Sequence, residues 1–282
     1  MSVNTVLRLL EKNHDYIIFI SRIMTFSEED IRAIRQEIID NKRPRYLYKY
    51  RGIKSAIVFL KNNSIYFSNY KDFNDPFESA CKKIIDYTPK DYFEAFLRWG
   101  VDTFSAMQKL EEIASKHVNS HDLQLQVADL ILNGFSYFCM AKEPDNILMW
   151  SHYADSHEGV CFKFDLLQDN TFLNTVPVDY NSAYLEFDTL NGNPMPIITR
   201  KSSDWSYEQE HRTIATDIKG LHQINKEVLV EIIFGCRTHK RNRTRIRSLV
   251  RNNGFNRVSF SEAVVNPEAY KLDIQPFSFS KR

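Results

Sequence analysis

The sequence lacks several features that mark common classes of protein. Its four cysteines are scattered without a Cys-x-x-Cys pair, which argues against a zinc site and for reduced thiols in the cytosol. No apolar run approaches membrane-spanning length, and the first residues lack the basic and hydrophobic segments of a secretory signal. Lysines plus arginines number 37 against 36 aspartates plus glutamates, so we expect no global attraction to nucleic acid or to an anionic membrane. These absences predict a cytoplasmic protein without a structural metal or membrane contact.

Glycine and proline are also scarce, at 8 and 9 residues, whereas the chain holds 20 phenylalanines and 14 tyrosines. We expect most phenylalanines in the core. The tyrosines gather beside charged residues, as in 46–51 (Tyr-Leu-Tyr-Lys-Tyr-Arg), where amphipathic rings can stack on a planar ligand. No G-x-G-x-x-G motif occurs, so a Rossmann dinucleotide site is disfavoured.

Hydrophobic periodicity predicts an α+β fold with a single mixed, mostly antiparallel sheet. Residues 1–45 form an N-terminal helical segment packed on the core, and residues 46–282 form the core domain, with a helical insertion at about 88–134. Strands are expected at 46–51, 64–68, 135–139, 159–165, 179–180, 205–215, 227–234, 257–260 and 270–274. Further helices are expected at 53–60, 146–154 and 238–253.

The most informative stretch is 205–212, Trp-Ser-Tyr-Glu-Gln-Glu-His-Arg. In a strand, alternate side chains share a face, so Glu208, Glu210 and Arg212 would lie side by side. Two adjacent carboxylates repel, and one pKa rises unless a cation or hydrogen-bond donors keep both ionised. Arg212 stands where that cation is needed. We interpret the stretch as part of a site; the alternative is a solvated edge strand with a weak surface ion pair.

A polar loop at 70–78 follows the strand predicted at 64–68 and contains Asn-Asp-Pro. Asx side chains in such loops bond their own backbone, which gives the loop a purely structural interpretation. The functional interpretation is a rigid strand exit that displays Asn74, Asp75 and Glu78 towards a cleft.

The helix predicted at 146–154 carries aromatic and imidazole side chains. Trp150 and Tyr153 approach one apolar side, which predicts that they anchor the helix in the core. His152 and His157 are better candidates for ligand contact or proton transfer, because imidazole titrates near neutral pH. Their spacing suits no metal, and no acidic or cysteine partner stands at a helix-face interval, so we expect no metal site.

The predicted helix at 238–251 is basic, and its charged residues have no acidic neighbours. Such a run is usually the solvated face of an amphipathic helix. The functional alternative is a local phosphate or nucleic-acid contact, although no aromatic residues are interleaved for base stacking. The residues concerned are Lys240, Arg241, Arg243, Arg245 and Arg247.

Four motifs stand in a characteristic order along the chain. They are 47–51 (Leu-Tyr-Lys-Tyr-Arg), 73–78 (Phe-Asn-Asp-Pro-Phe-Glu), 149–154 (Met-Trp-Ser-His-Tyr-Ala) with 159–161 (Gly-Val-Cys), and 205–212. Together they resemble a bacterial family, the domain-of-unknown-function family 2971, from residue 46 to the C terminus. The resemblance implies no activity. It implies a component of bacterial stress or phage-conflict loci, such as a toxin or defence effector with a partner protein.

A second, weaker resemblance is to ADP-ribosyltransferases, which place an Arg or His, a Ser-led motif and a Glu-x-Glu on successive strands around a nicotinamide dinucleotide. Arg51, Ser68 and Glu208-Gln209-Glu210 stand in that order here. The resemblance implies NAD as substrate, with Glu210 stabilising a ribosyl oxocarbenium and Glu208 orienting or deprotonating the acceptor. It also implies that Arg51 holds a phosphate bidentately.

These interpretations predict an enzyme that acts on NAD or another nucleotide. The expected catalytic residues are Glu210, Glu208 and His152. The expected substrate- or cofactor-binding residues are Tyr48, Lys49, Arg51, Ser68, Asn74, Asp75, Trp150, Tyr153 and Arg212. One alternative is a non-catalytic nucleic-acid or protein-binding module that uses the basic helix. The other is a magnesium-dependent nuclease in which Asp75 or Glu78 supplies a further carboxylate.

Overall fold

A computed structural model of the chain describes residues 26–82, 87–98, 100–115, 124, 128, 129, 131–190, 192–216 and 218–279. Within these residues, no helix is both long enough and apolar enough to cross a membrane. The first part of the predicted N-terminal helical segment, residues 1–25, lies outside the described residues, and so does part of the helical insertion.

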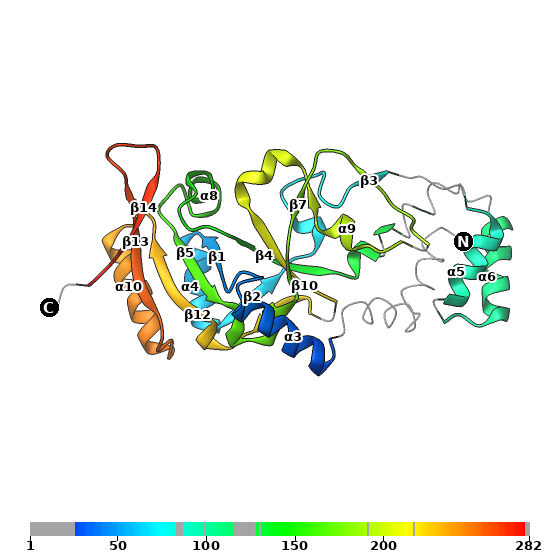
Figure 1. The fold of residues 1–282 in the computed structure, drawn as a ribbon, viewed down its shortest axis with the longest axis horizontal. Helices are drawn as coiled ribbons and strands as arrows, with labels where there is room; N and C mark the ends of the chain where they lie inside the picture. The colour runs from blue at the N-terminus through cyan, green and yellow to red at the C-terminus, as the bar shows by residue number, and fades with distance from the viewer. Residues whose placement is uncertain are drawn as a thin grey trace.

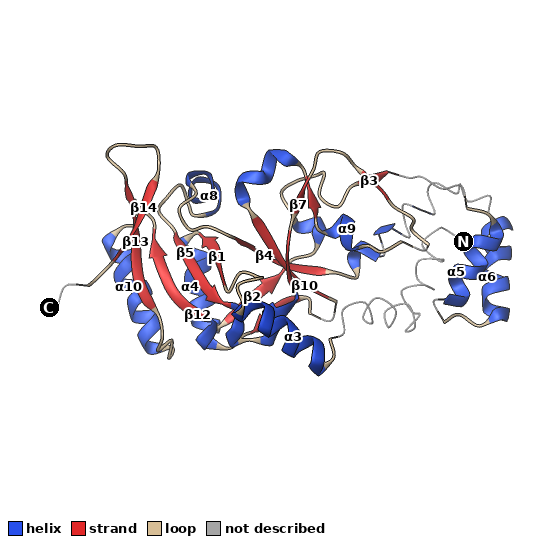
Figure 2. Cartoon of the chain, in the orientation of Figure 1, coloured by secondary structure: helices blue, strands red, loops and turns tan. Residues whose placement is uncertain are grey.

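An eight-stranded sheet runs through the middle of the molecule (Figures 1 and 2). Its strand order is β14-β13-β12-β5-β1-β4-β10-β6, and every neighbouring pair is antiparallel except β12 with β13. The predicted α+β class, with a mixed and mostly antiparallel sheet, is therefore confirmed. Its strands are β1 (Tyr46–Arg51), β4 (Ser136–Ala141), β5 (Val160–Asp165), β6 (Thr175–Pro177), β10 (Glu210–Ala215), β12 (Leu229–Phe234), β13 (Ser259–Val265) and β14 (Leu272–Pro276).

The remaining strands pair in three two-stranded sheets, which corrects the expectation that all strands share one sheet. The strand expected at 64–68 is one of them, because among the described residues its main chain pairs with the main sheet only at the bridge between Ser68 and Tyr137. The pairs are β2 (Ser64–Phe67) with β11 (Gly220–Gln223), β3 (Cys81–Lys82) with β8 (Leu185–Glu186), and β7 (Asp179–Tyr180) with β9 (Arg200–Lys201).

Helices bury their apolar faces against this framework. The α-helices are α3 (Glu28–Ile39), α4 (Ile53–Asn62), α5 (Pro89–Arg98), α6 (Thr103–Ser115), α8 (Ile147–Tyr153), α9 (Met195–Ile198) and α10 (Lys240–Asn252). Figure 1 shows α4 and α10 side by side, and Phe59 of α4 and Ile246 of α10 are buried in one cluster with Phe162 and Phe164 of β5. Burial of this aromatic cluster stabilises the fold through the hydrophobic effect.

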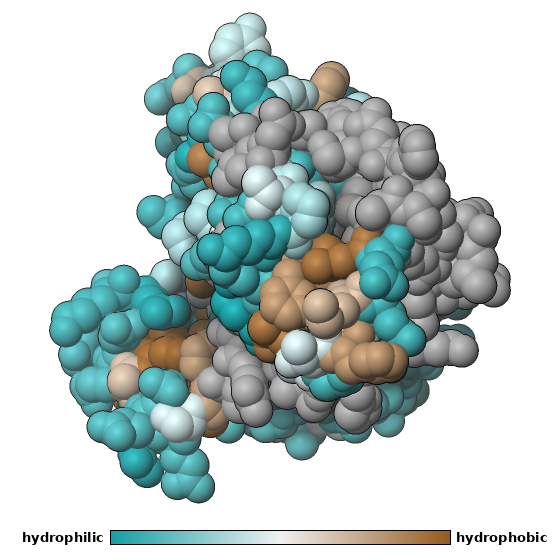
Figure 3. Space-filling view, turned by 90° about the vertical axis from the view of Figure 1, so that its right-hand side faces the viewer, coloured by the Kyte–Doolittle hydropathy of each residue, from teal (hydrophilic) through white to brown (hydrophobic). Residues whose placement is uncertain are grey.

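Helices α5 and α6 lie at the opposite end of the molecule, in the region of the predicted helical insertion (Figure 1). Tyr92 and Phe96 of α5 are buried in a second hydrophobic cluster, which also contains Tyr137 of β4. This end shows a hydrophobic patch (Figure 3), where Phe104 and Met107 of α6 are largely exposed.

The stretch at 205–212 differs from the predicted strand. Residues Ser203–Glu208 form a 3-10 helix, η4, and Gln209 follows it in the left-handed region with a φ of 43°. Strand β10 begins only at Glu210. The turn hydrogen bond from the Gln209 N–H to the Ser206 carbonyl closes the end of η4 and interrupts the strand alternation. Glu208 and Glu210 therefore meet across a tight turn rather than on one strand face.

Strands β1 and β4 are neighbours in the sheet but separate after a single residue pair. β1 pairs with β5 along its whole length, whereas it pairs with β4 only at Tyr48 and Ala141. Further along the same edge of β4, Tyr137 exchanges two main-chain hydrogen bonds with Ser68. Main-chain groups alternate sides along an antiparallel strand, so those of Cys139, midway between Tyr137 and Ala141, face this gap. The gap creates the candidate site.

Candidate functional site

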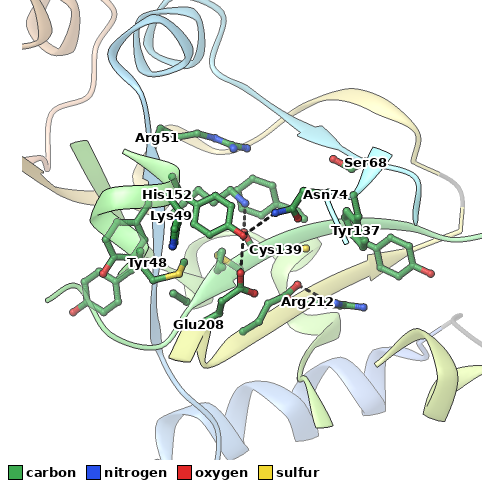
Figure 4. Close-up of a pocket in the computed structure, with 18 of the residues that line it drawn as sticks. Tyr48, Lys49, Arg51, Ser68, Asn74, Tyr137, Cys139, His152, Glu208 and Arg212 are labelled. Atoms are coloured by element: carbon green, nitrogen blue, oxygen red, sulfur yellow. Dashed lines mark hydrogen bonds and ion pairs between the residues drawn. The ribbon is translucent and has the colours of Figure 1, made fainter. Parts of the chain in front are cut away.

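The gap between β1 and β4 opens into a cavity of about 450 Å³ (Figure 4). That volume is in the range of small-molecule sites. Most of the predicted site residues line it, although they come from distant parts of the sequence. They are Tyr48, Lys49, Arg51, Ser68, Asn74, His152, Tyr153, Glu208, Glu210 and Arg212.

Trp150 and Asp75 do not line the cavity, which corrects the predicted binding set. Trp150 is completely buried, its ring N–H donates to the Pro144 carbonyl at 2.8 Å, and its ring meets Tyr50 edge-on. The interpretation of Trp150 as a core anchor is the right one. The Asp75 carboxylate turns back to accept a hydrogen bond from the Phe77 N–H at 2.9 Å, as Asx side chains in tight loops do.

Three buried carboxylates and two buried cations form one network beside the cavity. Lys201 donates to Glu208 at 2.6 Å and to Glu210 at 3.3 Å. Arg212 has no exposed surface and donates from Nε to Glu210 at 2.8 Å and from Nη1 to Glu78 at 2.7 Å. With all five groups ionised, the network carries one net negative charge. The carboxylates and cations therefore cannot all be paired one to one.

The two cations determine how these carboxylates titrate. Burial alone raises the pKa of Glu210, but Arg212 and Lys201 outweigh it and hold that pKa well below its usual range. For Glu78, burial outweighs Arg212, and the pKa is raised. Glu210 is therefore a fixed negative charge, whereas Glu78 takes up a proton more readily than an exposed glutamate.

Tyr153 connects this network to the cavity. Its hydroxyl donates to Glu208 at 2.6 Å and lies 3.5 Å from the donating amide of Asn74 (Figure 4). Burial and the Glu208 carboxylate raise the pKa of Tyr153, so the phenol stays protonated near neutral pH. Both oxygens of Glu208 thus accept hydrogen bonds, one from Tyr153 and the other from Lys201.

Asn146 fixes the position of these two side chains relative to each other. Its side-chain oxygen accepts from the main-chain N–H groups of Leu148 and Met149, which caps α8. Its amide group donates to the Tyr207 carbonyl of η4 at 2.7 Å. Because Tyr153 ends α8 and Glu208 ends η4, one asparagine holds both elements in register.

The opposite wall of the cavity is cationic and comes from β1. Figure 4 shows Arg51 above the cavity and Glu208 and Arg212 below it. The Lys49 ammonium donates to the Cys139 main-chain carbonyl. In the described part of the chain, neither Lys49 nor Arg51 forms an ion pair. Burial lowers the pKa of Arg51. Burial and the nearby charge of Arg51 lower the pKa of Lys49 to about 8.

The two histidines of the α8 region lie in different places. His152 is exposed, lines the cavity and packs beside the rings of Tyr153 and Tyr207. His157 lies outside the cavity, with Nε2 3.0 Å from the Ser151 hydroxyl and Nδ1 buried without a hydrogen-bond partner. Of the pair, only His152 is placed to meet a ligand in this cavity.

The basic helix α10 uses part of its charge for packing. Arg243 ion-pairs with Glu262, and the Arg247 guanidinium lies 4.4 Å from the centroid of the Phe279 ring. Lys240, Arg241 and Arg245 are exposed. The predicted nucleic-acid contact therefore rests on these last three cations.

Lys201 is the one member of the five-residue ion-pair network that sequence reasoning missed. It lies in the two-residue strand β9, seven residues before Glu208, and no strand or helix pattern marks it. A signal was nevertheless present, since two close carboxylates need more positive charge than Arg212 alone supplies. The Arg200-Lys201 pair is the nearest preceding basic segment.

Comparison with known proteins supports the first resemblance over part of the chain. Residues 149–213 match a family model described as a protein of unknown function (DUF2971). The match is shorter than the span from residue 46 that the motifs predicted, but it includes most of α8, all of η4 and the start of β10. No curated protein and no solved structure matches the chain. The resemblance to ADP-ribosyltransferases remains a prediction.

Proposed function

We propose that this chain is an enzyme that binds NAD or a related nucleotide in the cavity between β1 and β4 and acts at its ribose. We further propose that it works in the bacterial cytoplasm as an effector of stress response or phage defence. The enzymatic proposal rests on one juxtaposition: the ion-paired carboxylates of Glu208 and Glu210 face the same cavity as Arg51, which has no acidic partner among the described residues.

A fixed negative charge suits cleavage of a nicotinamide–ribose bond. That cleavage develops positive charge on the ribose, and a preorganised carboxylate stabilises it. Glu210 fits this role because Arg212 and Lys201 keep it ionised. All four oxygens of Glu208 and Glu210 already accept hydrogen bonds. Their part is therefore electrostatic, and proton abstraction by Glu208 is no longer favoured.

The other wall of the cavity suits the anionic and planar parts of such a ligand. Within the described ranges, Arg51 presents a guanidinium without a carboxylate partner. Guanidinium groups bind phosphates bidentately. Aromatic rings also line the cavity, among them those of Tyr48, Phe73 and Tyr153. Such rings can stack on a nicotinamide or purine base.

The proposal is tested by incubating the purified protein with NAD and following the release of nicotinamide. We expect release by the wild type. Glu210→Gln should lower kcat by roughly 10²–10³-fold, the usual effect of removing one preorganised electrostatic group. Tyr153→Phe removes only the hydroxyl that contacts Glu208 and should lower kcat less. Glu227→Gln, a glutamate paired with Arg257 away from the cavity, is the matched control.

Circular dichroism establishes that each variant is folded before its turnover is compared. The proposal fails if folded wild-type protein releases no nicotinamide, alone or with candidate acceptors. It also fails if folded Glu210→Gln turns over at the wild-type rate.

The nuclease alternative is less well supported by the same residues. Magnesium needs carboxylate oxygens that are free to coordinate it. Glu78, Glu208 and Glu210 each instead have an oxygen bound to Lys201 or Arg212, and the second oxygen of Glu208 accepts from Tyr153. Across the described residues there is also no group of three or more His, Cys, Asp or Glu side chains arranged to hold a metal.

A further inference from the structure

The proposed reaction releases a proton, and the two carboxylates of the cavity are already engaged in hydrogen bonds. Glu208 accepts from Tyr153 and Lys201, and Glu210 accepts from Lys201 and Arg212. A reaction in which water or a hydroxyl group attacks a ribose releases a proton. Another group must take it up.

Lys49 is placed to do so. It projects from β1 into the cavity wall, where its Nζ donates one hydrogen to the Cys139 carbonyl and lies 5.0 Å from the centroid of the Phe138 ring. It has no ion-pair partner within the described residues, unlike Lys201 on the other side of the cavity. A neutral amine in this position keeps its bond to the carbonyl and still has a lone pair available.

The surroundings of Lys49 favour that neutral form. The charged or titratable groups that act on it are Arg51 from its own strand, Cys139 from β4, Glu210 from β10 and Glu208 from η4. Burial and Arg51 oppose the ammonium, whereas both glutamates favour it but are bound to their own cations. The result is a pKa of about 8, close to the pH at which a general base is most effective.

We propose that Lys49 is the proton acceptor of this cavity. The inference rests on the proposed function. The hydroxyl oxygen of the acceptor or of water forms a bond to the ribose carbon, while the bond between that carbon and nicotinamide breaks and leaves its electron pair on the nicotinamide nitrogen. The O–H bond of the attacking group breaks, and its proton forms an N–H bond on Lys49, which becomes an ammonium.

The ionisation of Lys49 can be measured without any turnover. Reductive methylation with ¹³C-formaldehyde labels the lysines, and the signal that is absent in Lys49→Arg identifies Lys49. We expect its NMR titration midpoint near 8, against about 10.4 for an unperturbed lysine side chain. Arg51→Gln should raise the midpoint, because it removes the like charge. A Lys49 midpoint at the unperturbed lysine value overturns the proposal.

Kinetics test the role itself. Arginine stays protonated in proteins, so Lys49→Arg keeps the charge but cannot accept a proton. We expect it to lower kcat by about 10²-fold or more, with little change in KM, and to abolish the rise of kcat with pH around 8. Lys54→Arg is the control. An unchanged kcat and pH profile in folded Lys49→Arg overturns the proposal.

The two arms separate this inference from the proposed function. If neither the wild type nor any variant releases nicotinamide, the proposed function fails. The titration still decides whether Lys49 is an available base in the cavity. If the wild type turns over and Lys49 titrates with the exposed lysines, the proposed function stands and this inference fails.

Discussion

Arg212 is a completely buried cation, and the free-energy cost of changing each carboxylate around it depends on how that carboxylate is paired. Glu210 is bound by both Arg212 and Lys201, whereas Glu78 is bound by Arg212 alone. Removing one partner of a buried pair is costly because it leaves an uncompensated charge. Because the network has an excess of one negative charge, we expect its carboxylates to contribute unequally to stability.

We expect Glu210→Gln to lower the free energy of unfolding by about 3–5 kcal/mol, because Arg212 and Lys201 lose the charge that they share. Glu78→Gln should cost clearly less. It keeps an oxygen acceptor for Arg212 and removes a carboxylate whose ionisation burial already opposes. Urea unfolding at pH 7 measures both, and equal losses would show that the two carboxylates contribute alike.

Among the elements, α8 has only seven residues and depends on its N-terminal cap. Isolated helices of this length are not stable in water, so the cap and the tertiary contacts of α8 determine its position. Asn146 supplies the cap and also the bond to η4. The position of Tyr153 against Glu208 therefore depends on a residue outside the cavity.

We expect Asn146→Ala to cost about 1–2 kcal/mol of stability through the lost cap, and also to lower nicotinamide release, because η4 is no longer held against α8. Ser27→Ala removes the cap of the distant helix α3 and is the matched control. It should cost similar stability and leave turnover unchanged. Thermal unfolding and kcat of both variants check this, and equal effects on kcat would rule out a specific role for Asn146.

For the whole molecule, the shifted pKa values predict how stability depends on pH. Burial lowers the pKa values of His157 and His211, so below about 6.5 the unfolded chain binds more protons than the folded protein. The contribution of these histidines is complete above pH 6.5 and is lost as the pH falls through their folded pKa values. Glu210, whose pKa is also lowered, adds a further loss below 4.5, whereas Glu78, whose pKa is raised, acts in the opposite direction as the pH falls.

We therefore expect the thermal unfolding midpoint to be flat just above pH 6.5 and to fall as the pH decreases from 6.5 towards 4.5. His157→Gln should make that fall shallower, because the partly buried imidazole no longer has to stay neutral. Calorimetry of both proteins across this range measures the slopes. Identical slopes would exclude a contribution from His157.

Local patterns predicted the regular elements well. The strand at 46–51 has the predicted bounds, because its alternating aromatic and charged residues suit a strand. The turn through Gln209 was missed, because η4 is fixed by bonds to Asn146 and by Lys201 from another strand, and no periodicity records such contacts.

By itself, the sequence determined the α+β class, most strands and helices, and most side chains of the site, because hydrophobic period and residue chemistry are local properties. Tertiary structure decided where those side chains meet. The separation of β1 from β4 after Tyr48 creates the cavity. The ion pairs of Lys201 with Glu208 and Glu210, and the long-range ion pair between Glu78 and Arg212, set the charge of its wall. Such pairings depend on the strand order and on which residues from separate elements are buried together. For that reason they turned Glu208 and Glu210 from a strand-face pair into part of a five-membered buried network.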